Sequence, residues 1–279
     1  MEFFSVIMLI LAGQYRLSGS YRIMPIKVGS PAEKTLRFLG LLGLNPAVFL
    51  ALRYIPRYFS DRKRFLAAGG QITGAMPVLT DYRASAGSVK GHYFHQDLLV
   101  ASYIHEANPA RHVDVGSRID GFVAHVAAFR EIEILDIRPL TGIGHPRIRF
   151  TQCDLMAPPK EFDGTSDSIS CLHALEHFGL GRYGDPIDPE GHRKGFASLV
   201  RMLRPGGTLY LSFPISQPAV LFNAHRIFAP TAALEWAKDR LELKRFDYVD
   251  DAGDLHRQAD PTKLSGLIYG CGIYTFRKL

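Results

Sequence analysis

Residues 112–121 read HVDVGSRIDG, and this stretch decides the fold of the chain. Its first five residues have the composition of a short buried strand that ends in Gly116. A glycine at that point allows the backbone to turn sharply and to approach a ligand closely. Residues 121–129 then have the composition of a helix. A buried strand that turns directly into a helix is typical of parallel α/β sheets.

The same alternation continues toward the C-terminus. Further strands are predicted over residues 131–137, 147–153, 167–172, 208–213, 241–249 and 272–277. The segment 190–203 is predicted to be an amphipathic helix, because its apolar residues recur at i, i+3, i+4 and i+7: Phe196, Leu199, Val200 and Leu203. Strands that alternate with helices indicate a mostly parallel sheet that is covered on both faces.

The chain before residue 91 does not show this alternation of strands and helices. Residues 31–70 are predicted to form helices with apolar stripes and interspersed arginines, followed by a linker. The division is therefore residues 1–90, a helical extension and linker, and residues 91–279, an α/β domain. The helices are expected to pack as a cap, although a basic amphipathic pair could also contact a membrane surface. Residues 3–12 are apolar but too short to span a bilayer, so we interpret residues 1–23 as a start-site artefact.

Composition narrows the classes of partner. The chain has 33 Lys and Arg against 27 Asp and Glu, a net charge of +6 that weakly favours acidic small molecules or a membrane surface. The basic residues are scattered, so nucleic acid is not an expected partner. Cys153, Cys171 and Cys271 share no spacing typical of metal sites, and they are expected to be buried thiols of a cytoplasmic protein.

Acidic residues follow two further strands of the predicted sheet. Ligands of open parallel sheets bind beyond the carboxyl ends of the strands. Asp136 closes the second strand twenty residues after Gly116 (136 − 116 = 20), where a carboxylate can accept hydrogen bonds from both hydroxyls of a ribose. Asp154 follows the third strand, where it can accept a bond from an adenine amino group while Leu155 lies against the ring. Read alone, Asp136 could be a surface residue and Asp154 a helix cap.

The strand ends together carry the series VDVGS, LDI, CDL, LHALEH and LRPGGTLYLSFP across residues 92–279. This series resembles the motifs of class I S-adenosylmethionine-dependent methyltransferases. The longer string HALEHFGLGRYGDPIDPEG, with FNAHRIF downstream, is similar to an uncharacterised bacterial family associated with surface-polysaccharide gene clusters. The resemblance implies a Rossmann-like fold, whose seven-stranded sheet has an antiparallel last strand, and S-adenosylmethionine as the cofactor.

The resemblance also implies roles for matching residues. Gly116 and Ser117 would lie under the methionine part of the cofactor, Asp114 near its amino group, and His173 by the sulfonium. The full set of implied cofactor contacts is Asp114, Gly116, Ser117, Arg118, Gly121, Asp136, Ile137, Asp154, Leu155 and His173. One departure concerns the first loop, where the family has Gly-x-Gly-x-Gly. Arg118 and Asp120 replace the later glycines, so their side chains could crowd the cofactor or, for Arg118, bind its carboxylate.

Polar residues after the fourth and fifth strands predict the acceptor site. The long loop over residues 178–191 and the segment 222–226 supply Arg182, Tyr183, Asp185, Asp188, Asn223 and Arg226. These groups suit a small polar or sugar-linked acceptor that is methylated on oxygen. A hydroxyl must lose its proton during transfer, and His177 or His225 is the expected base. The alternative is that these residues are solvated loop charges and buried, hydrogen-bonded histidines.

Other functions compete with this interpretation. The string His173-x-x-Glu176-His177 matches the H-x-x-E-H pattern of inverted zinc peptidases, but the flanking motifs favour a methyltransferase, so no metal is expected. A dinucleotide-dependent oxidoreductase of nucleotide sugars would need G-x-G-x-x-G in the first loop, which is absent. The altered glycine loop also leaves open a non-catalytic scaffold in glycan assembly.

Overall fold

The computed structural model describes residues 50–142 and 144–279, and the chain divides into two compact units, Met1–Ser88 and Val89–Leu279. The described part of the first unit contains η1 (Leu52–Tyr54), α4 (Ile55–Ala67) and η2 (Thr80–Arg83). Pro56 lies in the first turn of α4, where a missing backbone N–H costs no hydrogen bond. The predicted helical residues 31–49 and the residues 1–23 lie outside the described part. Within residues 50–142 and 144–279, no helix has the length and apolar character needed to cross a bilayer.

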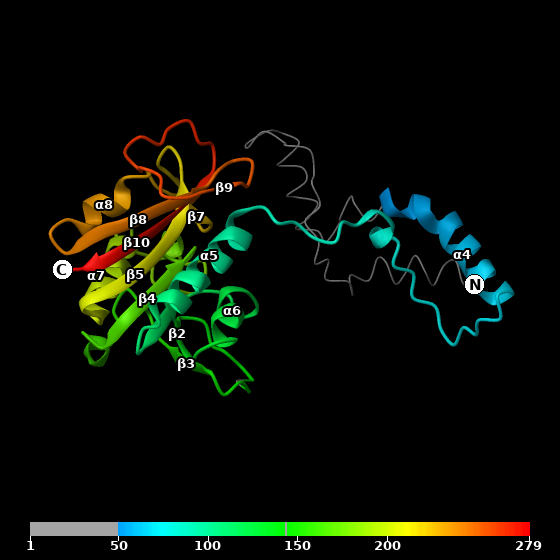
Figure 1. The fold of residues 1–279 in the computed structure, drawn as a ribbon, viewed down its shortest axis with the longest axis horizontal. Coiled ribbons are helices and arrows are strands. Elements are labelled where there is room, and N and C mark those ends of the chain that lie inside the picture. The colour runs from blue at the N-terminus through cyan, green and yellow to red at the C-terminus, as the bar shows by residue number, and fades with distance from the viewer. Residues whose placement is uncertain (1–49, 143) are drawn as a thin grey trace. The chain divides into compact units, whose positions relative to one another are not determined.

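The second unit is built on an eight-stranded sheet with the order β3-β2-β1-β4-β5-β10-β8-β9 (Figure 1). Strands β1 to β5 run parallel, and β10 is inserted antiparallel between β5 and β8. The predicted Rossmann-like sheet with an antiparallel last strand is therefore confirmed. Its strands are β1 (His112–Val115), β2 (Ile132–Asp136), β3 (Ile148–Gln152), β4 (Ser166–Leu172), β5 (Leu203–Ile215), β8 (Leu241–Val249), β9 (Leu255–His256) and β10 (Gly270–Lys278).

The strands differ from the prediction in three places. Strand β9 adds a two-residue eighth strand at the sheet edge, beside β8. A separate hairpin, β6 (Ala219–Leu221) and β7 (His225–Ile227), follows β5. Strand β5 begins five residues before the predicted start because Arg204 to Gly207 bulge out between two paired positions, Leu203 opposite Ser166 and Thr208 opposite Ser168.

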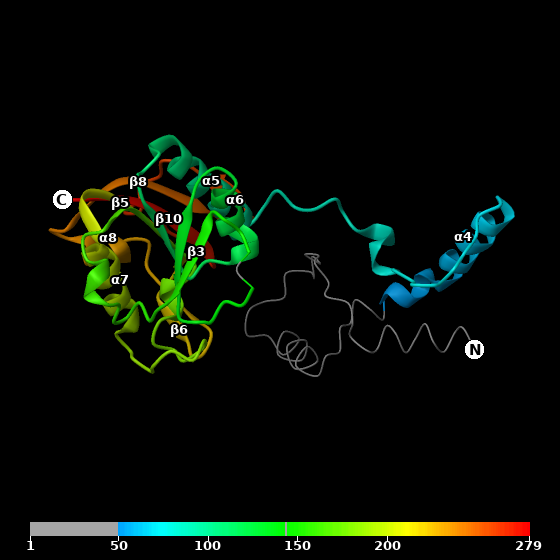
Figure 2. The same ribbon diagram turned by 90° about the horizontal axis from the view of Figure 1, so that it is seen from below.

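Helices cover both faces of the sheet (Figures 1 and 2). The buried side chains of α5 (His92–Ala107) and α6 (Ala124–Ala127) belong to one core cluster, whereas α7 (Gly191–Met202) and α8 (Ala232–Ala237) contribute to the other. The short turns are η3 (Ile119–Val123), η4 (Lys160–Phe162) and η5 (Leu175–His177). The helix expected over residues 121–129 is thus shorter than predicted, and α5 was not predicted at all.

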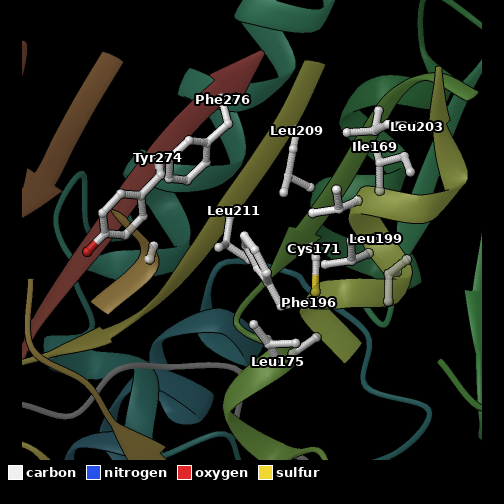
Figure 3. Close-up of a cluster of buried hydrophobic side chains, with 14 of the residues drawn as sticks. Ile169, Cys171, Leu175, Phe196, Leu199, Leu203, Leu209, Leu211, Tyr274 and Phe276 are labelled. Carbon is white, nitrogen blue, oxygen red and sulfur yellow. The ribbon is translucent and has the colours of Figure 1, made fainter. Parts of the chain in front are cut away.

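The main core follows from the period-two alternation of the strands. Leu209, Leu211 and Phe213 of β5 point to the face covered by α7, and Tyr210 points to the opposite face. Figure 3 shows Phe196 and Leu199 of α7 in the same cluster as side chains of β4, β5 and β10. The three cysteines are free and buried, as expected from their spacing.

A buried polar network lies beneath the carboxyl end of β1. His112 contacts the hydroxyls of Ser168 (Nδ1, 2.8 Å) and Ser170 (Nε2, 3.2 Å), and Ser170 donates a hydrogen bond to Asp114. Burial lowers the pKa of His112 to about 3. This histidine is therefore neutral in the folded protein throughout the weakly acidic range, where an unfolded histidine takes up a proton.

We predict that His112→Gln makes the protein less sensitive to acid. In the wild type the unfolded state binds a proton at His112 below pH 6.5 while the folded state does not, so the free energy of unfolding falls as the pH falls. Relative to the wild type, the variant should gain about 1.4 kcal/mol per pH unit between pH 6 and 4. Urea unfolding across this range measures the difference. The same substitution at the exposed His105 is the control, and identical pH slopes for wild type and His112→Gln would contradict the prediction.

Candidate functional site

Two adjoining clefts open at the carboxyl ends of the parallel strands. The first cleft is lined by residues at or just after the ends of β1, β2, β3 and β4: Gly116, Asp136, Asp154 and His173. The second cleft lies between the start of α5, the loop after β1 and the segment after β4. Both lie where the strand order reverses, because β2 is on one side of β1 and β4 on the other. Open parallel sheets bind their ligands at such a reversal.

The turn after β1 requires a glycine. Gly116 has φ +74°, and a Cβ atom placed on it would lie 2.9 Å from the Cβ of Ala174. Asp114 stabilises the turn, because its carboxylate accepts hydrogen bonds from the backbone N–H (3.1 Å) and the hydroxyl (2.9 Å) of Ser117. Burial raises the pKa of Asp114 to about 7, against the lowering effect of the hydrogen bonds from Ser170 and Ser117.

Asp114 has no exposed surface and lines neither cleft, so its place in the structure is to hold the turn rather than to face a ligand. Ser117 and Gly121 line the second cleft. Arg118 also lines the second cleft, where its guanidinium pairs with Asp120 at 2.7 Å. Of the predicted contacts in this loop, Gly116 is thus the one that lines the first cleft.

Asp136 ends β2 with its carboxylate bound by its neighbour. Arg138 donates to it through Nε (2.9 Å to Oδ1) and through its backbone N–H (2.8 Å). The Arg138 guanidinium also lies over the ring of Tyr183, 4.6 Å from its centroid. Arg138 and Tyr183 line both clefts, and Ile137 lines the first. The sequence did not assign a role to Arg138.

Asp154 and Leu155 form the far wall of the first cleft. Leu155 is 3% exposed, and Asp154 accepts a hydrogen bond from the backbone N–H of Met156 at 2.8 Å. Asp154 therefore caps a local turn rather than a helix and also lines the cleft, and its contact with adenine stays a prediction. Its carboxylate keeps acceptor capacity beyond this one bond, because an ionised carboxylate offers about four lone-pair positions.

His173 and Glu176 form a buried pair between the two clefts. The backbone of His173 is left-handed (φ +48°), and its Nδ1 lies 2.9 Å from the Glu176 carboxylate. Burial lowers the pKa of His173, but Cys271 and Glu176 outweigh this effect and raise it well above its usual range. Burial conversely raises the pKa of Glu176, and the charge of His173 brings it below its usual range. The H-x-x-E-H string forms no helix, because His173 precedes η5, which covers only three residues.

The two candidate bases lie on the wall of the second cleft. The rings of His177 and His225 are 6.4 Å apart between centroids. Nδ1 of His177 lies 2.7 Å from the carbonyl oxygen of Ala224, and Nε2 of His225 lies 3.3 Å from the hydroxyl of Tyr269. Burial lowers the pKa of both histidines below the usual value. Both imidazoles are therefore neutral at pH 7, as a general base must be.

Several residues predicted to bind the acceptor instead hold the loops together. Asp185 accepts hydrogen bonds from the backbone of Gly179 (2.7 Å) and Gly181 (3.1 Å), although it also lines the first cleft. Arg226 is 4% exposed and donates to the carbonyl oxygens of Phe178 (2.6 Å) and Pro189 (3.2 Å). Since Arg226 lines neither cleft, the structure corrects its predicted contact with the acceptor.

Two further loop residues lie away from the clefts. Asp188 pairs with Lys194 at 2.5 Å, and Asn223 has φ +61° in the exposed turn of the β6–β7 hairpin. Neither lines either of the two clefts, and the acceptor contact of Asn223 stays a prediction. Arg182 and Tyr183 remain as cleft-lining residues of the long loop.

Sequence reasoning missed the contribution of α5 and of Tyr269. His92, Tyr93, Gln96 and Asp97 from the start of α5 line the second cleft, together with Tyr269. The signal that could have identified them is the string HYFHQD at residues 92–97, which is rich in hydrogen-bonding and aromatic groups. Asp97 and Gln96 are buried polar residues, and burial raises the pKa of Asp97 above its usual value.

We predict that Gly116→Ala destabilises the protein by about 1–3 kcal/mol, because alanine is strained at a left-handed φ and its Cβ would collide with Ala174. Urea unfolding of both proteins gives the difference. Gly144→Ala is the matched control, since a Cβ there meets nothing within 4 Å. If both variants lose the same free energy, the turn does not need glycine.

Comparisons with known proteins give distant matches. A family model described as "Caenorhabditis protein of unknown function, DUF268" matches residues 147–237. No curated protein matches the sequence.

Among solved structures, the [4+2]-cyclase SpnF is 18% identical (TM-score 0.47; 65% of this chain and 81% of that chain are covered). The N-methyltransferase NodS from Bradyrhizobium japonicum WM9, in complex with S-adenosyl-L-homocysteine, is 13% identical (TM-score 0.47; 67% and 88%). The Burkholderia thailandensis 1,6-didemethyltoxoflavin-N1-methyltransferase is 16% identical (TM-score 0.45; 91% and 93%).

Proposed function

We propose that the chain is an S-adenosylmethionine-dependent methyltransferase. The observation that carries the proposal is the first cleft, where Gly116, Asp136, Asp154 and His173 converge from the ends of four parallel strands. Each residue suits one part of the cofactor. Gly116 allows the backbone to approach closely, and the Asp136 carboxylate suits the ribose. Asp154 can accept a bond from the adenine amino group, and His173 is a polar group for the methyl end. Leu155 adds an apolar surface for the adenine ring.

The glycine after β1 suits the close approach of such a cofactor. A Cβ at position 116 would push toward Ala174, which also lines this cleft, so the glycine keeps the floor open. When bound, S-adenosylmethionine supplies a methyl group on an activated sulfonium, so positioning is the main task left to the protein.

The second cleft is proposed to hold the acceptor. It presents paired donors and acceptors on its wall, including Gln96, Asp97, Arg182 and Tyr269. Such a lining suits hydroxyl groups better than an apolar molecule. We therefore propose O-methylation of a polar, sugar-linked acceptor, a substrate consistent with the resemblance to proteins of polysaccharide clusters. His177 or His225 would take the proton of the acceptor hydroxyl at its unprotonated ring nitrogen.

The cofactor assignment predicts that Asp136→Ala weakens binding of S-adenosylmethionine by roughly 10²-fold or more. The ribose hydroxyls would displace Arg138 from the Asp136 carboxylate, and the substitution removes the two charged hydrogen bonds formed in its place, each worth about 1.5–3 kcal/mol. Calorimetric titration measures the dissociation constants. The control is Asp163→Ala, which removes a carboxylate that pairs with Arg201 away from both clefts. Unchanged affinity in folded Asp136→Ala protein would refute the ribose assignment, and binding of a nicotinamide dinucleotide in its place would favour an oxidoreductase.

The base assignment predicts a distinct pH dependence. Since burial lowers the pKa of His177 and His225 from the usual value, kcat should be level above pH 7.5 and fall as the pH drops through the lowered pKa, because the imidazole becomes protonated. The variant of the true base, His177→Gln or His225→Gln, should lose about 10²–10⁴-fold in kcat with little change in cofactor affinity. His145→Gln, outside both clefts, is the control. If both cleft variants keep full kcat, neither histidine is the base.

The acceptor assignment is tested with cofactor labelled on the methyl group and a glycan extract of the host. Label should enter a polar, sugar-containing fraction, and Arg182→Ala should reduce its incorporation because Arg182 lines the second cleft. Label found only in protein, nucleic acid or apolar lipid would overturn the acceptor class. Cofactor binding without any transfer would instead favour a scaffold.

A further inference from the structure

Three potential metal ligands from distant parts of the sequence meet beside the second cleft. They are His92 at the start of α5, His173 after β4 and Cys271 in β10. One ligand atom of each lies within 4.8 Å of those of the other two. Among residues 50–142 and 144–279, no other set of three histidine, cysteine or carboxylate side chains lies close enough together to hold one ion.

His173 is oriented as a ligand of this group. Its Nδ1 is held by Glu176 at 2.9 Å, while its Nε2 is buried and has no hydrogen-bond partner. The side chain of His173 is only 5% exposed. Because the pKa of His173 is raised well above its usual range, the ring also carries a proton at Nε2, and a metal would bind there by displacing that proton while Glu176 keeps its bond to Nδ1, as in metal-bound histidines. A buried nitrogen without a partner is costly, so this atom calls for a ligand.

The other groups complete a site for a cation. Cys271 is wholly buried. Its sulfur makes long hydrogen bonds, to Gln96 (3.9 Å) and to the carbonyl oxygen of Gly272 (3.8 Å). The ring of His92 is nearly parallel to that of His173, at an interplanar angle of 15° and a centroid distance of 5.4 Å. The second carboxylate oxygen of Glu176 is also buried without a hydrogen-bond partner, beside the charge of His173.

We propose that His92, His173 and Cys271 bind a zinc ion, with Glu176 holding His173 in place from behind. A donor set of two imidazoles and one thiolate suits this borderline-soft cation. Bonds of about 2.3 Å to sulfur and 2.0–2.1 Å to nitrogen would draw the three side chains inward from their present spread. Three protein ligands leave one tetrahedral position open, as in catalytic zinc sites.

An ion held by these groups would be reached from the second cleft, which His92 and His173 line, whereas Cys271 is wholly buried. If the proposed function holds, the ion lies where the hydroxyl of the acceptor would bind, and it would polarise that oxygen. Binding of the ion itself does not depend on the proposed function.

The test is titration of chelator-treated full-length protein with Co²⁺ under reducing conditions, in the absence of S-adenosylmethionine. Four-coordinate cobalt bound to a thiolate should give a near-ultraviolet charge-transfer band and strong visible bands at one ion per chain, and Zn²⁺ should displace it. Metal analysis of protein purified without added metal should find zinc.

Variants assign the ligands. Cys271→Ser should abolish the charge-transfer band, whereas Cys153→Ser and Cys171→Ser, at buried cysteines outside the cluster, should retain it. Glu176→Gln should weaken cobalt binding by roughly 10–100-fold through loss of the support to His173. If substitution of the buried Cys271 impairs folding, His92→Gln tests the site instead, because His92 is half-buried. Circular dichroism checks the fold of each variant.

Absence of the charge-transfer band in wild-type protein, or a band that survives Cys271→Ser, would overturn the proposal. So would unchanged cobalt affinity in folded His92→Gln. A separate titration with S-adenosylmethionine keeps this result distinct from the proposed methyltransferase function, since either can fail while the other stands.

Discussion

The pair formed by His173 and Glu176 is the interaction on which the ligand-binding edge of the sheet depends. Both side chains are at most 5% exposed, and burying an ionised group is costly unless an opposite charge and hydrogen bonds compensate it. The left-handed backbone of His173 and the single 3-10 turn that follows are what bring the two groups within 2.9 Å. Removing either partner would leave the other buried and uncompensated, directly between the two clefts.

Loops around this pair are held by their own polar groups. Arg226 ties the carbonyl oxygens of Phe178 and Pro189 together from the β6–β7 hairpin, and Asp185 binds two backbone N–H groups of the long loop. A loop without regular secondary structure needs such bonds, because its buried backbone groups have no ladder to join. Arg182 also donates to the carbonyl oxygen of Ala224 (3.1 Å), and it lines the second cleft together with Tyr183.

The sequence predicted the sheet well and the site in part, for physical reasons. Alternation along β5 and the glycine after β1 are local signals, so the strands were found within a few residues. Polar loop residues are ambiguous locally, since the same Arg226 that could bind an acceptor can equally bind backbone carbonyls. The start of α5 was missed because its first residues are polar and aromatic, and its buried Val100 and Ile104 come later. Groups such as His92, His173 and Cys271 become neighbours only through the fold.

The first loop after β1 accommodates Arg118 and Asp120 without strain. Arg118 has ordinary extended backbone angles (φ −71°, ψ 134°), so no glycine is needed there. Its side chain is 72% exposed and that of Asp120 74%, and the two pair with each other. Neither is among the residues that line the first cleft, whereas both line the second. The replacement of the later glycines therefore leaves the floor of the first cleft to Gly116 and adds a charged pair to the wall where the acceptor is proposed to bind. The loop therefore carries polar side chains at positions 118 and 120, and the close approach of its backbone to a ligand depends on Gly116, directly after β1.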